Sequence, residues 1–478
     1  MLFNSFEFLI FFPVVTILYF LLPHKYRWLH LLIASCIFYC AFIPVYILIL
    51  FFTIAIDYIA GIAIENAAGT KRKWYLVMSI VANVGVLAIF KYYNFFIENI
   101  NVALDIYSTG SPHLSLLNII LPIGLSFHTF QAMSYTIEVY KGNQKAERHL
   151  GVYALYVMFY PQLVAGPIER PQNILHQLKA KHEFNYENFS AGIKQMIWGL
   201  FKKVVIADRL SEYVNIVFGN YQEYSGIVVV TAVVFFAFQI YCDFSGYSDI
   251  ALGAARTMGI RLMLNFNRPY FSTSIREFWS RWHISLSTWF RDYLYVPLGG
   301  NRVVKWKWFR NLFITFLVSG FWHGANWTFI FWGFLHGTYL IIEILLKPYL
   351  DKALPLRKTD GSVFFIPSFV RALGTFTLVC LAWTYFRAET FEQATQMIQS
   401  MFLPSQASIF VTGKLNLILC LFFILFMETI HVLERKQSIA DFLNGKSIFV
   451  RWSFYQSLIL LIVLFGVFDK QSFIYFQF

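Results

Sequence analysis

The sequence predicts an all-α, polytopic membrane protein, and three observations carry this prediction. Of its 478 residues, 58% are hydrophobic and only 13% are charged, whereas soluble domains carry about 25% charged residues. Apolar stretches of about 20 residues, the length that crosses a bilayer as a helix, recur along the chain. The basic residues behind the net charge of +12 fall between these stretches. We therefore expect about ten to twelve membrane crossings, some of them re-entrant, together with interfacial helices.

The crossings are expected where uncharged residues run longest. One of these stretches, 28–56, is long enough for most of two helices. The first stretch, 6–23, lacks the basic start and the small-residue cleavage site of a secretory signal peptide, so we expect it to be retained. The expected spans are 6–23, 28–56, 74–90, 226–241, 311–342, 372–386, 414–427 and 452–468.

The basic residues orient the chain in the membrane. Residues 1–6 and 98–115 contain no Lys or Arg, so the positive-inside rule places the amino terminus and the 98–115 loop outside. The same rule places 66–73, 141–149 and most of 170–210 and 256–310 inside. Because the cations alternate with the spans and form no continuous patch, nucleic-acid binding is not expected.

The chain is expected to fold as a single membrane-embedded domain over residues 1–478. Residues 1–115 form a helical scaffold in this division, 116–345 the core, and 346–478 the C-terminal helices. No internal repeat is visible, although transporters are often built from repeated halves. The five cysteines lie in apolar stretches without metal-ligand spacing, so we expect buried thiols and no metal site.

Two breaks in helical sequence predict an internal surface. Leu121-Pro122-Ile123-Gly124 precedes a helix that carries His128 and Gln131, and residues 160–172 hold three prolines and a glycine. Backbone groups released by Pro or Gly at membrane depth need protein or water as partners. Residues 160–172 are expected to form a re-entrant turn or an interfacial loop. His128, alone on an aromatic face, is expected to be a core residue.

Two amphipathic helices are expected on the inner side of the membrane. The first covers 187–210 and carries Lys202, Lys203 and Arg209. The second covers 275–292, where apolar residues including Trp282 recur every three or four positions beside His283. Asp243 and Asp249, six residues apart, point away from each other on a helix. We expect them to form ion pairs with the arginines that follow.

The most informative segment lies between Arg310 and Glu343, where His323 and His336 are the titratable side chains near neutral pH. An imidazole in an apolar segment is either bonded to a carbonyl as a structural group or poised for proton transfer. The two histidines are thirteen residues apart, roughly 20 Å and about 220° on an unbroken helix. They can share one site if Gly324-Ala325-Asn326 breaks that helix.

Seven motifs, taken together and in this order, resemble one family over nearly the whole chain. They are Leu-Pro-Ile-Gly-Leu-Ser-Phe (121–127), Val-Ala-Gly-Pro-Ile (164–168), Gly-Leu-Phe-Lys-Lys-Val-Val-Ile-Ala-Asp-Arg-Leu (199–210), Asp-Phe-Ser-Gly-Tyr-Ser-Asp-Ile-Ala (243–251), Phe-Trp-x-Arg-Trp-His-Ile-Ser-Leu-Ser (278–287), Phe-Trp-His-Gly (321–324) and Trp-Thr-Tyr-Phe-Arg-Ala (383–388). The sequence resembles the membrane-bound O-acyltransferase superfamily, and within it the bacterial branch that acetylates secreted polysaccharides.

The resemblance implies the site residues. His323 matches the family's histidine in an apolar helix, so it is implied to be the catalytic base. His283, forty positions upstream, matches a second polar position and is implied to be catalytic as well, either orienting the acceptor or donor or stabilising the developing oxyanion. A central tunnel is implied, with His336, Trp322, Asn326, Trp282 and Gln131 expected to line it. Acetyl-coenzyme A is the implied donor, bound without a permanent cofactor, and the cations expected to hold its phosphates are Lys202, Lys203, Arg209 and Arg276.

The resemblance also implies a cellular setting. The enzyme is expected to cross the bacterial cytoplasmic membrane several times, contact membrane lipid, and relay acetyl groups to an extracytoplasmic polysaccharide acetyltransferase. The chain offers no sizeable external domain of its own for gripping a polysaccharide, which agrees with a need for such a partner. Two alternatives stay open: D-alanyl transfer from a carrier protein to teichoic acid, and a transporter or export channel for polysaccharide.

Overall fold

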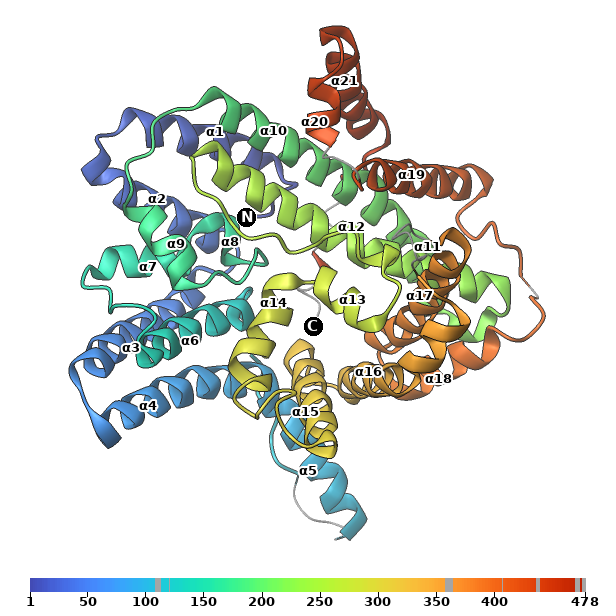
Figure 1. Cartoon of the computed structure of the whole chain (residues 1–478), viewed down its shortest axis with the longest axis horizontal. Helices are drawn as coiled ribbons and strands as arrows, with labels where there is room; N and C mark the ends of the chain where they lie inside the picture. Colours follow the sequence, from blue (N-terminus) through green and yellow to red (C-terminus); the bar gives the residue numbers. More distant parts are fainter. Residues whose placement is uncertain are drawn as a thin grey trace. The chain divides into compact units, whose positions relative to one another are not determined.

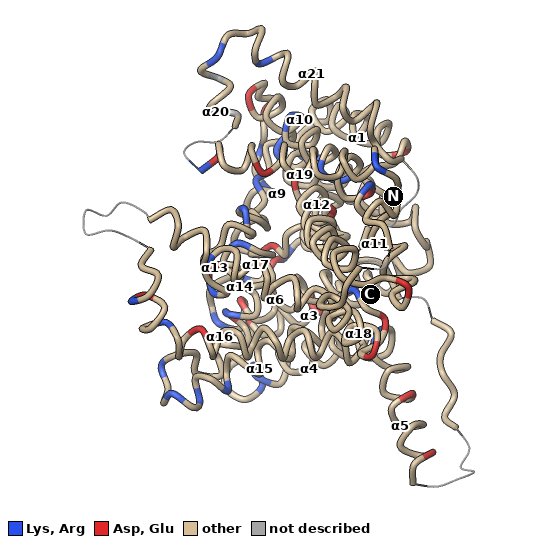
Figure 2. Tube along the Cα trace, turned by 90° about the vertical axis from the view of Figure 1, so that its right-hand side faces the viewer, with Lys and Arg blue, Asp and Glu red and all other residues tan. Residues whose placement is uncertain are grey.

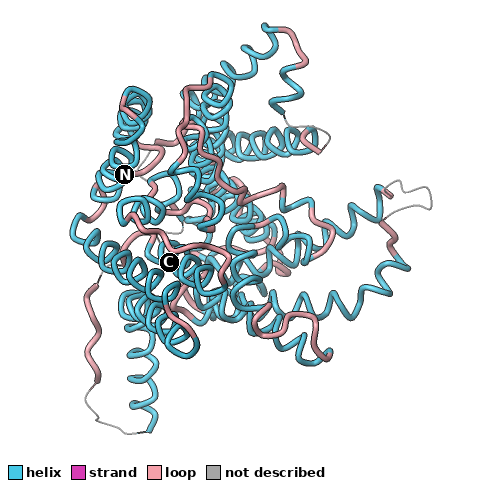
Figure 3. The backbone as a smooth tube through the Cα atoms, turned by 60° about the vertical axis from the view of Figure 1, so that its left-hand side comes forward, coloured by secondary structure: helices cyan, strands magenta, loops and turns pink. Residues whose placement is uncertain are grey.

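The protein is built from helices and loops, with no strand in the part of the chain that the structure describes (Figure 1, Figure 3). The computed structural model describes residues 1–107, 113–119, 121–356, 364–405, 407–435, 439–468 and 473–474. The sequence also predicts a polar loop over residues 351–368, and this loop lies partly outside the described residues. The predicted all-α fold class is confirmed.

Seven helical stretches within the described residues are long and apolar enough to cross a membrane, and Phe6–Leu21 is a shorter apolar helix. In Figure 2 the helices are mostly tan, and charged residues gather mainly at helix ends and in connecting segments. The protein is thus a multi-pass membrane protein, although fewer helices meet this criterion than the ten to twelve crossings expected. The seven are Pro44–Asn66, Gly69–Tyr107, Ile227–Thr257, Trp327–Ala353, Phe365–Arg387, Lys414–Leu433 and Ile448–Phe465.

The chain divides into two compact units, and each is described separately. Unit 1 comprises Met1–Met196 and Tyr247–Met263, and unit 2 comprises Ile197–Gly246 and Leu264–Ile474. The helices of unit 1 are α1 (Phe6–Leu21), α2 (His24–Cys40), η1 (Pro44–Tyr46), α3 (Ile47–Asn66), α4 (Gly69–Leu87), η2 (Ala88–Tyr92), α5 (Tyr93–Tyr107), α6 (Leu125–Lys141), α7 (Leu150–Met158), α8 (Tyr160–Leu163), α9 (Pro171–Lys179) and most of α10 (Tyr186–Leu200).

A polar cluster lies at the centre of the α3–α4–α6 packing in unit 1, which we call the Asp57 cluster: Asp57, Ser79 and Asn83. The carboxylate of Asp57 accepts a hydrogen bond from Ser79 Oγ at 2.6 Å. It also accepts bonds from Asn83 Nδ2 at 2.9 and 2.8 Å. A buried carboxylate is costly unless it is bonded. These contacts join α3 to α4 within the apolar scaffold.

The predicted breaks in unit 1 are present. Gly124 has a φ of 76°, a left-handed conformation that favours glycine, and α6 begins directly after it. Residues 160–172 form the short helix α8, a turn and the start of α9, and they are largely buried, so this segment is not a solvated loop. Within α6, His128 is buried and bonded to Thr53, as expected of a core residue.

Unit 2 contains the remaining helices. They are η3 (Phe201–Ala207), α11 (Asp208–Gly219), η4 (Tyr221–Glu223), most of α12 (Ile227–Thr257), η5 (Pro269–Phe271), α13 (Ile275–Arg281), α14 (Ile284–Phe290), η6 (Arg291–Tyr295), α15 (Lys305–His323), α16 (Trp327–Ala353), α17 (Phe365–Arg387), α18 (Phe391–Ser400), α19 (Lys414–Leu433), α20 (Ile439–Asn444) and α21 (Ile448–Phe465). A π-helical turn, η3, separates α10 from α11, so the helix expected over 187–210 is interrupted.

The prediction of one continuous helix over 275–292 was wrong. It is broken between α13 and α14, where His283 has a φ of 43°, rare for a residue with a side chain. Two backbone bonds hold this bend, from Ile284 N–H to the Asn265 carbonyl and from Asn267 N–H to the Arg281 carbonyl, both 2.9 Å. Strained backbone of this kind is often found at functional sites.

Helices α15 and α16 pack in close contact because glycines face each other. A Cβ atom on Gly333 would lie 2.2 Å from the Phe316 carbonyl oxygen, and one on Gly320 would lie 2.3 Å from that of Phe329. Only glycine permits this approach of two backbones, a common device between membrane helices. The close packing sets the end of α15 against the first turns of α16.

Candidate active site

His323 is the last residue of α15 and is 6% exposed. Its ring centre lies 4.9 Å from that of Trp322, 5.0 Å from that of Trp332 and 5.4 Å from that of Phe386. Trp332 comes from α16 and Phe386 from α17. The imidazole predicted to be the catalytic base is therefore enclosed by aromatic rings from three helices, a setting that restricts water.

The segment after His323 breaks the helix, as the sequence allowed. Asn326 is the N-cap of α16, and its Oδ1 accepts a hydrogen bond from the Thr328 N–H at 3.0 Å. Its Nδ2 donates to the Glu389 carbonyl at 3.0 Å. Both ends of this amide are thus engaged in holding the turn between α15 and α16 and tying it to the end of α17. A tunnel-lining role for Asn326 stays a prediction.

The break brings His336 close to the same site. The ring centre of His336 lies 4.9 Å from that of Trp332, which also contacts His323. Its Nδ1 accepts a hydrogen bond from Trp279 Nε1 of α13 at 3.3 Å. Trp383 of α17 stacks on Trp332 at 5.8 Å. We call this group the His323 cluster; its members are Trp279, His323, Trp332, His336, Trp383 and Phe386.

His283 lies farther along the aromatic core of unit 2. It is 1% exposed, and its ring centre lies 4.6 Å from that of Phe244 and 6.5 Å from that of Phe266. Burial lowers the pKa of His283 to about 3, so this imidazole is neutral at pH 7. Its neighbour Trp282 contacts Trp383 at 5.0 Å and so joins the bend at His283 to the His323 cluster.

The four cations predicted to bind phosphate are not gathered at one place. Lys203 pairs with Asp208 at 2.8 Å and with Asp243 at 2.7 Å. Burial alone would lower the pKa of Lys203, but these two carboxylates raise it. Asp243 therefore pairs with a lysine that precedes it rather than with the arginines that follow.

The other three cations have different surroundings. Lys202 is buried and donates to Ser245 Oγ at 2.9 Å. Arg209 donates to Asn416 and to the Phe465 carbonyl, whereas Arg276 is exposed at the start of α13. Of the other predicted tunnel residues, Trp322 is buried beside His323. Gln131 belongs to unit 1, where its Nε2 donates to the Tyr156 carbonyl.

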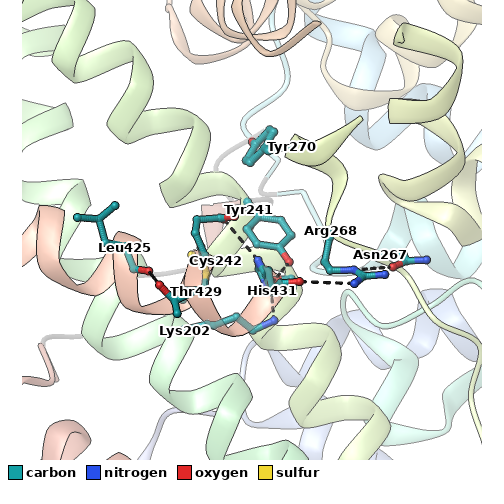
Figure 4. Close-up of polar contacts among 12 residues, drawn as sticks. Lys202, Tyr241, Cys242, Asn267, Arg268, Tyr270, Leu425, Thr429 and His431 are labelled. Carbon is teal, nitrogen blue, oxygen red and sulfur yellow. Dashed lines mark hydrogen bonds and ion pairs between the residues drawn. The ribbon is translucent and has the colours of Figure 1, made fainter. Parts of the chain in front are cut away.

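A second polar group in unit 2 connects three of its segments (Figure 4). Tyr241 Oη lies 3.3 Å from His431 Nε2, and Arg268 donates to the His431 carbonyl at 3.5 Å. The Lys202 ammonium lies 5.7 Å from the centre of the Tyr241 ring. Arg435, one turn beyond His431, packs on Phe271 at 4.3 Å.

Three guanidinium groups lie near one another beside this polar group. The pKa of Arg435 is lowered by burial and then by repulsion from Arg268 and Arg281, while Glu428 and Glu277 partly oppose this. Glu277 is itself engaged, because it binds Arg281 at 2.6 Å and the Thr273 N–H at 2.7 Å. The arrangement concentrates positive charge in a way that suits an anion such as phosphate.

Sequence reasoning missed Trp279, Trp332, Trp383 and Phe386. For Trp332 a signal existed, since it lies one helical turn before His336 and therefore on the same face of α16. For Trp279, the sequence indicated only a place on the apolar stripe of the helix expected over 275–292. Trp383 and Phe386 stand in a matching motif but some sixty residues from His323, and only tertiary packing brings them to it.

Comparison with known proteins now identifies the family. Residues 147–388 match the model of MBOAT, the membrane-bound O-acyltransferase family. A probable alginate O-acetylase of Azotobacter vinelandii is 41% identical over 84% of this chain and 78% of its own length.

The chain belongs to the membrane-bound O-acyltransferase family.

Two further relatives are named for other activities. The peptidoglycan O-acetyltransferase of Helicobacter pylori is 37% identical over 78% of this chain and 73% of its own length. The teichoic acid D-alanyltransferase of Streptococcus thermophilus is 31% identical over 57% of this chain and 69% of its own length. This chain is thus a membrane-bound O-acyltransferase, and the matched region contains the whole His323 cluster.

Proposed function

We propose that this acyltransferase moves an acetyl group from acetyl-coenzyme A to a hydroxyl acceptor in the O-acetylation of a secreted or cell-wall polysaccharide. The observation that carries the proposal is His323, a buried imidazole at a helix end, in a chain that is 41% identical to a probable alginate O-acetylase. The similarity to a peptidoglycan O-acetyltransferase supports a glycan acceptor.

His323 acts in this proposal as the general base. A hydroxyl is a weak nucleophile at neutral pH, and a neutral imidazole within hydrogen-bond reach can accept its proton as the oxygen attacks the thioester carbon. The rings of Trp322, Trp332 and Phe386 around it would limit hydrolysis of the thioester by water. His283, neutral in its aromatic pocket, would orient the acceptor or the donor.

The phosphates of the donor need cations. Arg268, which the sequence also places among the basic residues of the inner side, joins the four predicted cations in the proposal. Arg281 and Arg435 join it as well, because the three charges lie close enough to repel one another. Lys203 contributes least, since two carboxylates already neutralise it. Arg435→Gln should raise the KM for acetyl-coenzyme A several-fold with little change in kcat, because phosphate binding acts on the ground state and the transition state alike.

The distribution of basic residues supports the proposed direction of transfer. Arg268 and Arg281 fall in the range 256–310, which the positive-inside rule makes cytoplasmic, and Arg435 lies close to both, which suits a cytosolic donor. We place the chain in the bacterial cytoplasmic membrane with an extracytoplasmic amino terminus. The acetyl group would then pass across the membrane to an extracytoplasmic acetyltransferase or acceptor.

The test uses the full chain in lipid nanodiscs with radiolabelled acetyl-coenzyme A and, as a probe acceptor, oligomers of mannuronic acid. Release of the coenzyme thiol and transfer of label to the oligomers or to an added periplasmic extract would support the proposal. Transfer that survives in His323→Ala would remove His323 from the mechanism.

The D-alanyl alternative is tested in the same preparation. It is supported by the 31% identity to a teichoic acid D-alanyltransferase, over a smaller share of this chain than the acetylase match covers. A D-alanyl carrier protein replaces acetyl-coenzyme A as the donor. Release of D-alanine from the carrier, with no consumption of acetyl-coenzyme A, would reverse the assignment.

A further inference from the structure

Two N–H groups of α16, both in the His323 cluster, have no acceptor within the described part of the chain. Trp332 and His336 are both 0% exposed. Among the described residues, neither Trp332 Nε1 nor His336 Nε2 has a hydrogen-bond partner. A buried donor left without an acceptor costs about 1–3 kcal/mol. Two such donors in one cluster therefore indicate a hydrogen-bond acceptor that comes from a bound molecule.

The tautomer of His336 follows from its neighbour. An indole nitrogen can only donate, so the bond from Trp279 Nε1 requires His336 Nδ1 to be an acceptor. A neutral imidazole then carries its proton on Nε2. His336 is therefore held as a donor at Nε2 and would lose the Trp279 bond if it became protonated at Nδ1.

The two donors are placed to act together. Residues 332 and 336 are four apart on α16 and share one helix face. The Trp332 ring lies between the two imidazoles, 5.0 Å from His323 and 4.9 Å from His336. Trp383 of α17 stacks on Trp332. Two N–H donors on one helix face suit the binding of a single oxygen atom that acquires negative charge.

We propose that Trp332 Nε1–H and His336 Nε2–H bind the carbonyl oxygen of the acyl thioester and stabilise the oxyanion formed on it. The inference rests on the proposed function and assigns its oxyanion site to His336 and Trp332 rather than to His283. His283 packs against Phe244 and Phe266. Its ring contacts reach Trp332 only through Phe266, Trp282 and Trp383 in turn, as far as the described residues show.

The acceptor hydroxyl oxygen bonds to the acetyl carbon, its proton passes to His323, and the electron pair of the carbonyl bond moves onto the oxygen. The two N–H groups bind this oxyanion. When it collapses, the carbon–sulfur bond breaks, and the thiolate leaves and takes the proton from His323. An ester and a free thiol result, with no oxidant or reductant required.

The experiment measures kcat and KM for acetyl-coenzyme A in nanodiscs with the mannuronate oligomers as probe acceptor. His336→Phe keeps an aromatic ring of similar size and removes both nitrogens, and Trp332→Phe removes the indole N–H together with part of the ring volume. Each should lower kcat about a hundredfold, as loss of one oxyanion donor does. The KM for acetyl-coenzyme A should change less than about threefold, since the contact strengthens in the transition state.

Three further variants separate this role from packing. His336→Gln retains both an acceptor for Trp279 and a donor, so it should recover at least about tenfold of the lost kcat. Trp279→Phe no longer fixes the His336 tautomer and should give an intermediate loss. Trp306→Phe makes the same change at a site that is 62% exposed and should have no effect.

The outcomes are distinguishable. If the wild-type chain transfers acetyl and His336→Phe keeps kcat within about threefold, the oxyanion site is overturned while the proposed function stands. A loss of kcat matched by a lower melting temperature, with His336→Gln no better than His336→Phe, would mean packing alone and would also overturn it. A wild-type chain that releases no thiol from acetyl-coenzyme A would overturn both.

Discussion

The Asp57 cluster of unit 1 and the His323 cluster of unit 2 are both buried groups of polar side chains, and they use their hydrogen-bonding capacity in opposite ways. The Asp57 carboxylate receives bonds from Ser79 and Asn83, so the protein itself compensates for its burial. In the His323 cluster, Trp332 and His336 keep N–H groups without an acceptor among the described residues. The first arrangement stabilises a scaffold, and the second is suited to a substrate.

The largest expected effect is a loss of activity without a loss of stability, in the His323 cluster. His323→Gln should lower kcat about a thousandfold, because general base catalysis contributes roughly 10²–10⁴ in rate. The melting temperature should hardly change, since glutamine fills part of the space and can form hydrogen bonds. Kinetics and thermal unfolding of the same nanodisc sample check this, and a variant with wild-type kcat would exclude His323 as the base.

The next effect is a loss of stability without a loss of activity, in the Asp57 cluster. Asp57→Leu leaves the Ser79 and Asn83 donors without their acceptor and should cost about 3 kcal/mol of unfolding free energy. Asp57→Asn, which keeps an acceptor, is the matched control and should cost less. In both variants kcat per folded molecule should equal that of the wild type. A kcat that fell with stability unchanged would mean that the Asp57 cluster is not mere scaffold.

A smaller effect is the pH dependence of stability that the buried His283 of unit 2 contributes. Burial lowers the pKa of His283 to about 3, whereas the unfolded chain binds that proton near pH 6.5. The stabilising contribution is present above pH 6.5 and declines as the pH falls toward 3. Between pH 7 and pH 5 this group should cost the wild type about 2 kcal/mol of stability. His283→Phe should lose that much less over the same range, and parallel pH curves for the two proteins would contradict the assignment.

The smallest effect concerns the turn that joins α15 to α16. Asn326→Ala removes the N-cap of α16 and should cost about 1 kcal/mol of stability. Because this turn places His323 against Trp332, a modest fall in kcat should accompany it. Asn326→Asp, which can still cap the helix, should be close to wild type in thermal unfolding. Equal stability of both variants would show that the cap contributes nothing.

Much of the architecture could be predicted because composition and periodicity are local properties. Apolar stretches such as 414–427 fall within helices, and the break at 324–326 was anticipated from Gly and Asn. The helix expected over 275–292 failed, since its apolar stripe is continuous but tertiary bonds from Asn265 and Asn267 hold His283 in a left-handed conformation. For the site, His323 and His336 were chosen from the sequence, but their aromatic neighbours Trp383 and Phe386 were not.

The sequence by itself determined the fold class, the family resemblance and which imidazoles lie in apolar segments, because each depends on residue type and spacing along the chain. Tertiary structure decided which groups meet. Gly320 and Gly333 allow α15 and α16 to approach so closely that the ring of Trp332 separates His323 from His336. The pairing of Lys203 with Asp208 and Asp243 was likewise decided in space. Such contacts depend on helix packing and on the cost of burying unpaired charge, and no local pattern records either.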